Sequence, residues 1–148
     1  MGASLECVMD AIEFYSWRGA CRWLSNFHRH AMEIDGWLWS TVEHFYQAAK
    51  TLDEEEKEGI WEAPTPSEAK RRGGIATLRP DWEQFKEEVM LTALRAKFSD
   101  PDLRLKLLDT GDSRLEEASP TDMYWGNKGK NRLGILLMQV REELGEPA

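Results

Sequence analysis

The segment from Pro80 to Phe98 is the part of the chain whose sequence most restricts its structure. Its apolar residues recur three or four positions apart, the spacing that places side chains on one face of a helix. Asp81 stands where an N-cap residue is expected. We therefore expect a long helix that buries one face, formed by Trp82, Phe85, Val89, Met90, Ala93, Leu94, Ala96 and Phe98.

Other helix signals flank this segment. Residues 40–43 have the pattern of a capping box and predict a helix through about Leu52. Residues 100–101, Asp-Pro, predict a helix start, and residues 109–111 its end. A last helix should follow Asn131, with a core face of Leu133, Leu136, Leu137, Val140 and Leu144. Between residues 53 and 74 we expect shorter helical pieces, one capped by Ser67 and ended by Gly73-Gly74.

Strand signals are fewer. Residues 12–15 form a short apolar run, residues 115–118 can be extended, and residues 31–39 carry Asp35-Gly36 between apolar residues, as hairpins do. The chain should therefore be a single compact α+β domain, mainly helical with a small antiparallel sheet. Residues 1–11 are expected to be a loosely ordered lead-in to a domain over residues 12–146.

Composition narrows the class of protein. The 148 residues are 41% hydrophobic, which favours a globular domain over a disordered chain. The net charge of −8 disfavours extended contact with nucleic acid, although residues 70–72 and residues 128–132 are basic enough to hold phosphates. With only two cysteines, no apolar span and no leader pattern, we expect reduced thiols, a cytoplasmic location and no membrane partner.

The segment from Trp39 to Lys50 holds the first set of reactive side chains. On a helix, offsets of three, four and seven residues bring side chains to one face, here Glu43, Tyr46, Gln47 and Lys50. An acid and an amine on one face could flank a ligand. The same residues also fit an ordinary helix, in which Glu43 closes the capping box and Lys50 is a solvated cation at the end.

The segment from Asp122 to Gly134 is a loop rich in glycine and lysine that opens into the last helix. Backbone N–H groups at such a helix start, together with the helix dipole, attract phosphate. Trp125 could stack on a base or cover a sugar. The alternative is a surface turn with solvated lysines. The spacing matches neither a Walker A loop nor a dinucleotide fingerprint. The three histidines and two cysteines lack metal-like spacing, so we expect no metal and no cofactor.

Taken in order along the chain, several motifs together resemble the NADAR family, also called YbiA-like. They cover nearly the whole chain from residue 14 to about residue 144. The motifs are Ser25-Asn26-Phe27, residues 39–50, residues 91–98, residues 107–110, residues 122–126 and residues 129–134.

The resemblance implies an N-glycosidase with one of two substrates. One is ADP-ribose attached to guanine in DNA, which implies an ADP-ribosyltransferase toxin acting on the same DNA. The other is a ribosylamino-pyrimidine phosphate of riboflavin biosynthesis, disfavoured here by a shorter loop after Gly126. The resemblance places the catalytic residues at Lys50, Glu43 and Asp122. The residues expected to bind substrate are Trp125, Gly126, Trp39, Ser25, Asn26, Phe27, Lys128, Lys130 and Asn131.

A ribose bound to an exocyclic amine can be released by two routes. An oxocarbenium route needs a carboxylate and an acid for the leaving nitrogen. A ring-opened imine lets a lysine take over the sugar as a Schiff base. Our hypothesis makes Lys50 the nucleophile, with Glu43 or Asp122 moving the proton. A module that binds ADP-ribose without cleaving it, and a purely structural domain, are the alternatives.

Overall fold

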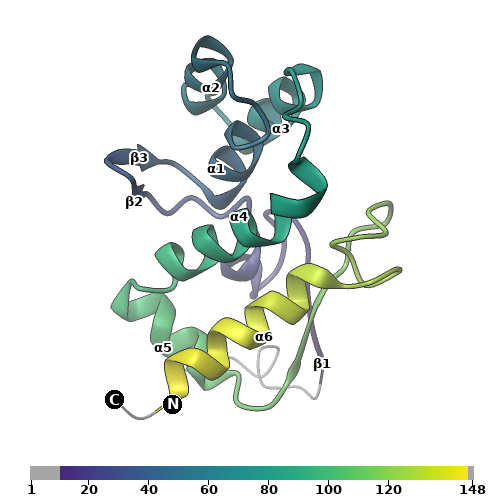
Figure 1. The fold of residues 1–148 in the computed structure, drawn as a ribbon. Helices are drawn as coiled ribbons and strands as arrows, with labels where there is room; N and C mark the ends of the chain where they lie inside the picture. Colours follow the sequence, from purple (N-terminus) through teal and green to yellow (C-terminus); the bar gives the residue numbers. More distant parts are fainter. Residues whose placement is uncertain (1–10, 147–148) are drawn as a thin grey trace. The chain divides into compact units, whose positions relative to one another are not determined.

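The structure is a computed structural model that describes residues 11–146 (Figure 1). The lead-in expected over residues 1–11 lies outside the described residues except for Ala11, which begins the first strand. The chain divides into two compact units, one formed by residues 29–97 and the other by residues up to 28 and from 98 onward. Within residues 11–146, no helix is both long and apolar enough to cross a bilayer.

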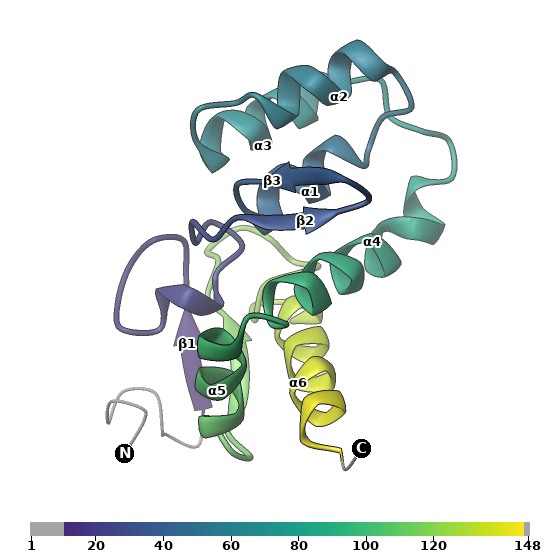
Figure 2. The same ribbon diagram turned by 90° about the vertical axis from the view of Figure 1, so that its left-hand side faces the viewer.

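The unit of residues 29–97 begins with a hairpin of β2 (Met32–Ile34) and β3 (Trp37–Trp39), which pair antiparallel. Asp35 and Gly36 join the strands with φ values of 52° and 85°, the left-handed conformations that Asp-Gly hairpin turns require. Four helices follow: α1 (Val42–Ala48), α2 (Glu54–Trp61), α3 (Pro66–Ile75) and α4 (Trp82–Lys97). The short helix α1 packs against all three others (Figure 2).

The other unit joins segments far apart in sequence. Strand β1 (Ala11–Phe14) pairs in parallel with β4 (Arg114–Glu117). A 3-10 turn, η2 (Arg22–Leu24), and two helices, α5 (Pro101–Asp109) and α6 (Arg132–Gly145), complete this unit. Helix α6 packs on β4 and on α5. Its residues Leu133, Leu136, Leu137 and Val140 are buried, as the sequence predicted.

The predicted fold class, mainly helical α+β with a small antiparallel sheet, is confirmed. The parallel pairing of β1 with β4 was not predicted, because the local sequence of neither segment indicates which strand it pairs with. Two helix starts were misplaced by the sequence. The hydroxyl of Thr65, rather than Ser67, caps α3, and Gly73-Gly74 lie inside that helix. Thr41, rather than Ser40, caps α1, which ends at Ala48 and not near Leu52.

Cys21 differs from the expectation of reduced thiols. Its side chain is buried and takes part in a disulfide.

Candidate active site

Helix α1 carries the first set of predicted catalytic residues. The Thr41 hydroxyl accepts a hydrogen bond from the backbone N–H of His44 at 3.1 Å, which makes Thr41 the N-cap. The third helical residue is therefore His44. The expected capping box, with Glu43 in that position, is wrong by one residue. The alternative explanation of Glu43 as a capping residue is thereby removed.

Glu43 is a buried acid, with 7% of its surface exposed. One turn further along α1, the amide nitrogen of Gln47 donates to Glu43 Oε2 at 2.6 Å. Gln47 is itself buried. A buried carboxylate that accepts a short amide hydrogen bond is held in one orientation, as a proton-transfer group needs to be.

Lys50 lies just beyond the end of α1. Its Nζ stands 5.5 Å from the centre of the Tyr46 ring, a cation–π distance. The backbone around it is also tied down, since Arg79 N donates to Lys50 O at 2.7 Å. The sequence placed Glu43, Tyr46 and Lys50 on one helix face; the structure keeps the first two in the helix and puts Lys50 in the turn after it.

The Glu56 carboxylate holds the turn that follows Lys50 by three hydrogen bonds, which we call the Glu56 clip. Glu56 Oε1 accepts from the Thr51 hydroxyl at 2.6 Å and from Thr77 N at 3.0 Å, while Oε2 accepts from the Thr77 hydroxyl at 3.1 Å. These bonds, led by that of Thr51, lower the pKa of Glu56 below its ordinary value. The sequence predicted only short helical pieces in this region and did not predict these bonds of Glu56.

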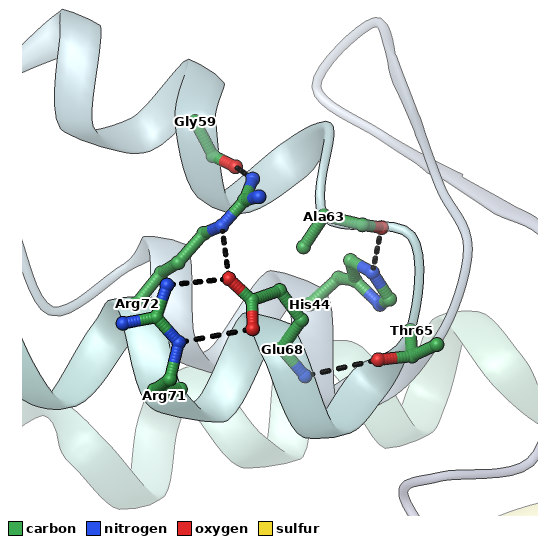
Figure 3. Close-up of polar contacts among 7 residues, drawn as sticks. All are labelled: His44, Gly59, Ala63, Thr65, Glu68, Arg71 and Arg72. Atoms are coloured by element: carbon green, nitrogen blue, oxygen red, sulfur yellow. Dashed lines mark hydrogen bonds and ion pairs between the residues drawn. The ribbon is translucent and has the colours of Figure 1, made fainter.

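His44 has a structural role on α1. It is fully buried, and its Nδ1 lies 2.8 Å from the Thr41 hydroxyl. Its Nε2 lies 2.9 Å from Ala63 O (Figure 3). Since a carbonyl only accepts, Nε2 carries the proton and Nδ1 accepts from Thr41. Burial is the main cause that lowers the pKa of His44, against the raising effect of the Ala63 bond.

The basic run of residues 70–72 is largely used within the protein. Glu68 accepts from Arg71 at 2.6 Å and from Arg72 at 2.8 Å, and Arg72 also donates to Gly59 O (Figure 3). The two guanidinium groups, Arg71 first, lower the pKa of Glu68 to about 2. This cluster joins α2 to α3, which weakens the expectation that it holds phosphate.

Trp39, expected to bind substrate, lies in an aromatic cluster. Its ring is stacked on Trp37 with centroids 5.9 Å apart and meets Phe45 edge-on at 5.4 Å. Trp61 packs edge-on against Trp37 and donates to Leu38 O at 2.8 Å. Trp39 is buried, whereas Trp37 and Trp61 keep 40% and 36% of their surface exposed. The exposed surface of this cluster is therefore contributed by Trp37 and Trp61 and not by Trp39.

Asp122 organises the loop that carries it, in the other unit. Its Oδ1 accepts from Tyr124 N at 3.0 Å and from Trp125 N at 2.8 Å. Trp125 is half-buried, and its ring meets that of Tyr124 edge-on at 4.9 Å. At Gly126 a Cβ would lie 2.5 Å from Asp122 O, so this glycine permits a close backbone approach. Asp122 and Gly126 thus shape the loop that presents Trp125.

The expected phosphate site at the start of α6 is only partly present. The backbone N–H groups of residues 126, 127 and 129–133 all donate to loop or strand carbonyls. The prediction that these groups are available to an anion is therefore wrong. Lys128 and Lys130 are exposed and remain the positive side chains of the loop.

Asn131 is occupied within the fold. It is buried, with left-handed φ of 49°, and it makes no side-chain cap of α6. Its side chain donates to Leu115 O at 3.0 Å and accepts from Glu117 N at 3.1 Å. The side-chain polar atoms of Asn131 are thus used within the fold, and its expected contact with substrate stays a prediction.

The Ser25-Asn26-Phe27 motif follows η2. Ser25 and Asn26 are buried, and Ser25 Oγ accepts from Phe27 N at 3.1 Å. This bond forms a tight turn, which explains the serine without a ligand.

The structure also reveals an amine that the sequence did not single out. Lys97, the last residue of α4, is fully buried, and this burial lowers its pKa to about 7. A lysine that is partly neutral near pH 7 has the property required of a Schiff-base nucleophile. The apolar spacing of α4 correctly predicted the burial of Met90, Ala93 and Leu94, whereas Phe85, expected on the same buried face, is exposed. Such spacing could not predict the burial of a lysine.

Comparison with known proteins decides the family. The NADAR domain matches residues 13–145. The chain belongs to the NADAR family. It is 45% identical over 140 residues to N-glycosidase YbiA of Escherichia coli, covering 90% of this chain and 88% of the relative. An N-glycosidase of Nostoc punctiforme is 45% identical over 130 residues, with 81% and 83% covered.

Two further comparisons bear on fold and substrate. The NMR structure of the E. coli protein YbiA matches with a TM-score of 0.86 and 43% identity, covering 97% of this chain and 90% of that one. A chloroplastic riboflavin biosynthesis protein of Zea mays is 38% identical, and the match covers 91% of this chain and 25% of that longer protein. These NADAR relatives support an enzyme that acts on N-glycosidic bonds.

Proposed function

We propose that this NADAR protein hydrolyses the bond between a ribose carbon and an exocyclic nitrogen, and that its main substrate is ADP-ribose attached to guanine in DNA. The observation that carries the proposal is the buried Glu43 carboxylate, oriented by Gln47. It occurs in a chain 45% identical to an N-glycosidase over most of its length. An acid fixed in a buried setting is suited to move a proton to or from a leaving nitrogen.

Glu43 is the better candidate for proton transfer. Asp122 Oδ1 accepts two backbone N–H bonds that define its loop, so its carboxylate has a structural task. Glu43 has no comparable capping task, because Thr41 caps α1. We therefore assign the proton transfer to Glu43 and the shaping of the Trp125 loop to Asp122.

In the lysine route, the ribose first opens to an imine at its anomeric carbon. The neutral amine of Lys50 adds to that carbon, and Glu43 gives its proton to the guanine amine, which leaves. The sugar is then held as a lysine imine. Water adds to this imine, and its proton returns to Glu43. Release of the sugar regenerates the Lys50 amine, so the net reaction consumes one water.

A paired hydrolysis assay tests the proposal. Purified protein is given an oligonucleotide with ADP-ribosylated guanine and, separately, a ribosylamino-pyrimidine phosphate. We expect release of free ADP-ribose from the first, with turnover lowered at least about a hundredfold in Glu43→Gln and Lys50→Ala. Release from the pyrimidine substrate alone would move the function to the second class, which the Zea mays relative favours. Turnover of neither would favour a binding module.

Borohydride trapping identifies the amine. In the lysine route, reduction during turnover leaves a sugar adduct that peptide mass mapping assigns to one residue. We expect the adduct on Lys50. An adduct on Lys97 would transfer the nucleophile role to the lysine whose pKa burial lowers to about 7. An active enzyme with no adduct on either lysine would favour the oxocarbenium route.

A further inference from the structure

In the part of the chain that the structure describes, Gln47 makes one side-chain hydrogen bond, which it donates to Glu43. The two residues lie one turn apart on α1, both buried, with Gln47 Nε2 donating to Glu43 Oε2 at 2.6 Å. The orientation of the amide follows from chemistry, because the opposite orientation would set its oxygen against a carboxylate oxygen. This contact therefore favours the ionised carboxylate and fixes the direction in which it points.

The other end of the Gln47 amide makes no comparable contact. Among the described residues, Gln47 Oε1 has no hydrogen-bond partner, although it is buried. A buried acceptor without a donor lowers stability, and an apolar side chain of similar size would avoid that loss. Gln47 is thus a poor choice for packing alone and a good choice for holding Glu43.

Gly73 on α3 makes room for Gln47. A Cβ at residue 73 would collide with Gln47 Oε1 and lie 2.8 Å from Gln47 Cβ. Glycine inside a helix is unfavourable compared with alanine, so its presence here needs a reason, and this contact supplies one. The adjacent Gly74 is in the same helix but has nothing within 4 Å of its would-be Cβ.

We propose that Gln47 and Gly73 together form a positioning device for Glu43. Gln47 is the positioning residue, and Gly73 supplies the space that keeps the Gln47 amide directed at the carboxylate. A methyl group at residue 73 would displace the amide and release Glu43 from its orientation. The inference rests on the proposed function in one respect, namely that Glu43 transfers the proton.

The two neighbouring glycines provide a matched pair of variants. Gly73→Ala should lower kcat for base release by at least about tenfold with KM within about twofold, since substrate contacts are unchanged. Gly74→Ala should retain wild-type kinetics. The limb of the pH–rate profile set by Glu43 should move to higher pH in Gly73→Ala, because the bond favouring the carboxylate is lost.

A double-mutant cycle separates positioning from packing. Gln47→Ala should show the same loss of kcat and the same pH shift as Gly73→Ala. Alanine at residue 47 removes the amide that the added methyl group would displace, but its Cβ still lies 2.8 Å from the position of that methyl group. Adding Gly73→Ala to Gln47→Ala should therefore lower stability but cause no further loss in activity through Glu43. If the variants that carry Gly73→Ala do not fold, Gln47→Ala still decides the matter through its kcat and its pH profile. Wild-type kcat in Gln47→Ala, or equal activity of the two glycine variants, would overturn the proposal.

A second measurement keeps this inference distinct from the function. NMR titration of the Glu43 side-chain carboxyl carbon needs no substrate. We expect its titration midpoint to rise in Gln47→Ala and Gly73→Ala and to stay unchanged in Gly74→Ala. A protein with no turnover but with this shift would reject the proposed function and keep the positioning device. An unchanged midpoint in Gln47→Ala would reject the device.

Discussion

His44 Nε2 lies 2.9 Å from Ala63 O and joins helix α1 to the turn between α2 and α3. The other ring nitrogen is occupied by Thr41, the N-cap of the same helix. Both nitrogens of a fully buried imidazole are thus used to hold the helix that presents Glu43. Because this arrangement needs the neutral ring, its stability depends on pH.

The stability of the protein should fall in mild acid through His44. Burial lowers the pKa of His44 from its ordinary value of 6.5, so the unfolded chain binds this proton more readily than the folded one. The contribution is complete above about pH 6.5 and decreases as the pH falls below it. His44→Gln should be less stable at pH 7.5 by about 1–3 kcal/mol but lack this pH-dependent part. Urea unfolding from pH 7.5 to 5 measures both, and parallel decline in the two proteins would contradict the assignment.

Removing the Glu56 side chain should lower the rate of turnover, because its hydrogen bonds hold the turn next to Lys50. Glu56→Ala removes the bonds to Thr51 and Thr77, so we expect kcat for base release to fall by about tenfold to a hundredfold. Glu56→Gln should recover most of the activity, because its amide oxygen still accepts and its NH₂ can donate to the Thr77 hydroxyl. Exposed Glu55→Ala is the control. Wild-type kcat in Glu56→Ala would show that the clip does not position Lys50.

Because Lys97 is buried, we expect the free energy of unfolding to depend on pH in the alkaline range. Its folded pKa of about 7 lies well below the ordinary 10.5, so the unfolded chain binds the proton more tightly between these values. The free energy of unfolding should therefore rise with pH from about 7 to 10, relative to Lys97→Met, which lacks the group. Denaturant unfolding of both proteins at pH 7, 8.5 and 10 tests this. A constant difference across this range would mean that Lys97 is ionised in the folded protein.

Asn131 should matter for stability. Glycine accepts the left-handed backbone of this residue, so Asn131→Gly isolates the loss of the side-chain bonds to Leu115 and Glu117. We expect a loss of about 2–4 kcal/mol, and a larger one in Asn131→Ala, where the left-handed backbone adds strain. Thermal unfolding measures the order of the variants. A selective rise in KM in Asn131→Gly without loss of stability would return Asn131 to the substrate site.

Local signals predicted several elements correctly. The apolar stripe predicted over residues 82–98 corresponds to helix α4, and Asp35-Gly36 forms the hairpin turn. The Asp100 side chain caps α5 by accepting hydrogen bonds from the backbone N–H groups of residues 102 and 103. In each case the evidence lies within a few residues, in the helical repeat, a turn dipeptide or a cap. The same evidence misplaced the caps of α1 and α3, because two neighbouring hydroxyl residues can each start a helix.

The sequence by itself determined the secondary structure class and the segments that carry Glu43, Lys50, Asp122 and Trp125. Tertiary structure alone decided how these segments are used. It paired β1 with β4, placed Gln47 between Glu43 and Gly73, and buried Lys97. It also directed the backbone N–H groups of residues 126, 127 and 129–133 to carbonyls instead of an anion. Helical and turn patterns are set by neighbours along the chain, whereas hydrogen-bond partners and burial are set by residues that folding brings close from distant positions.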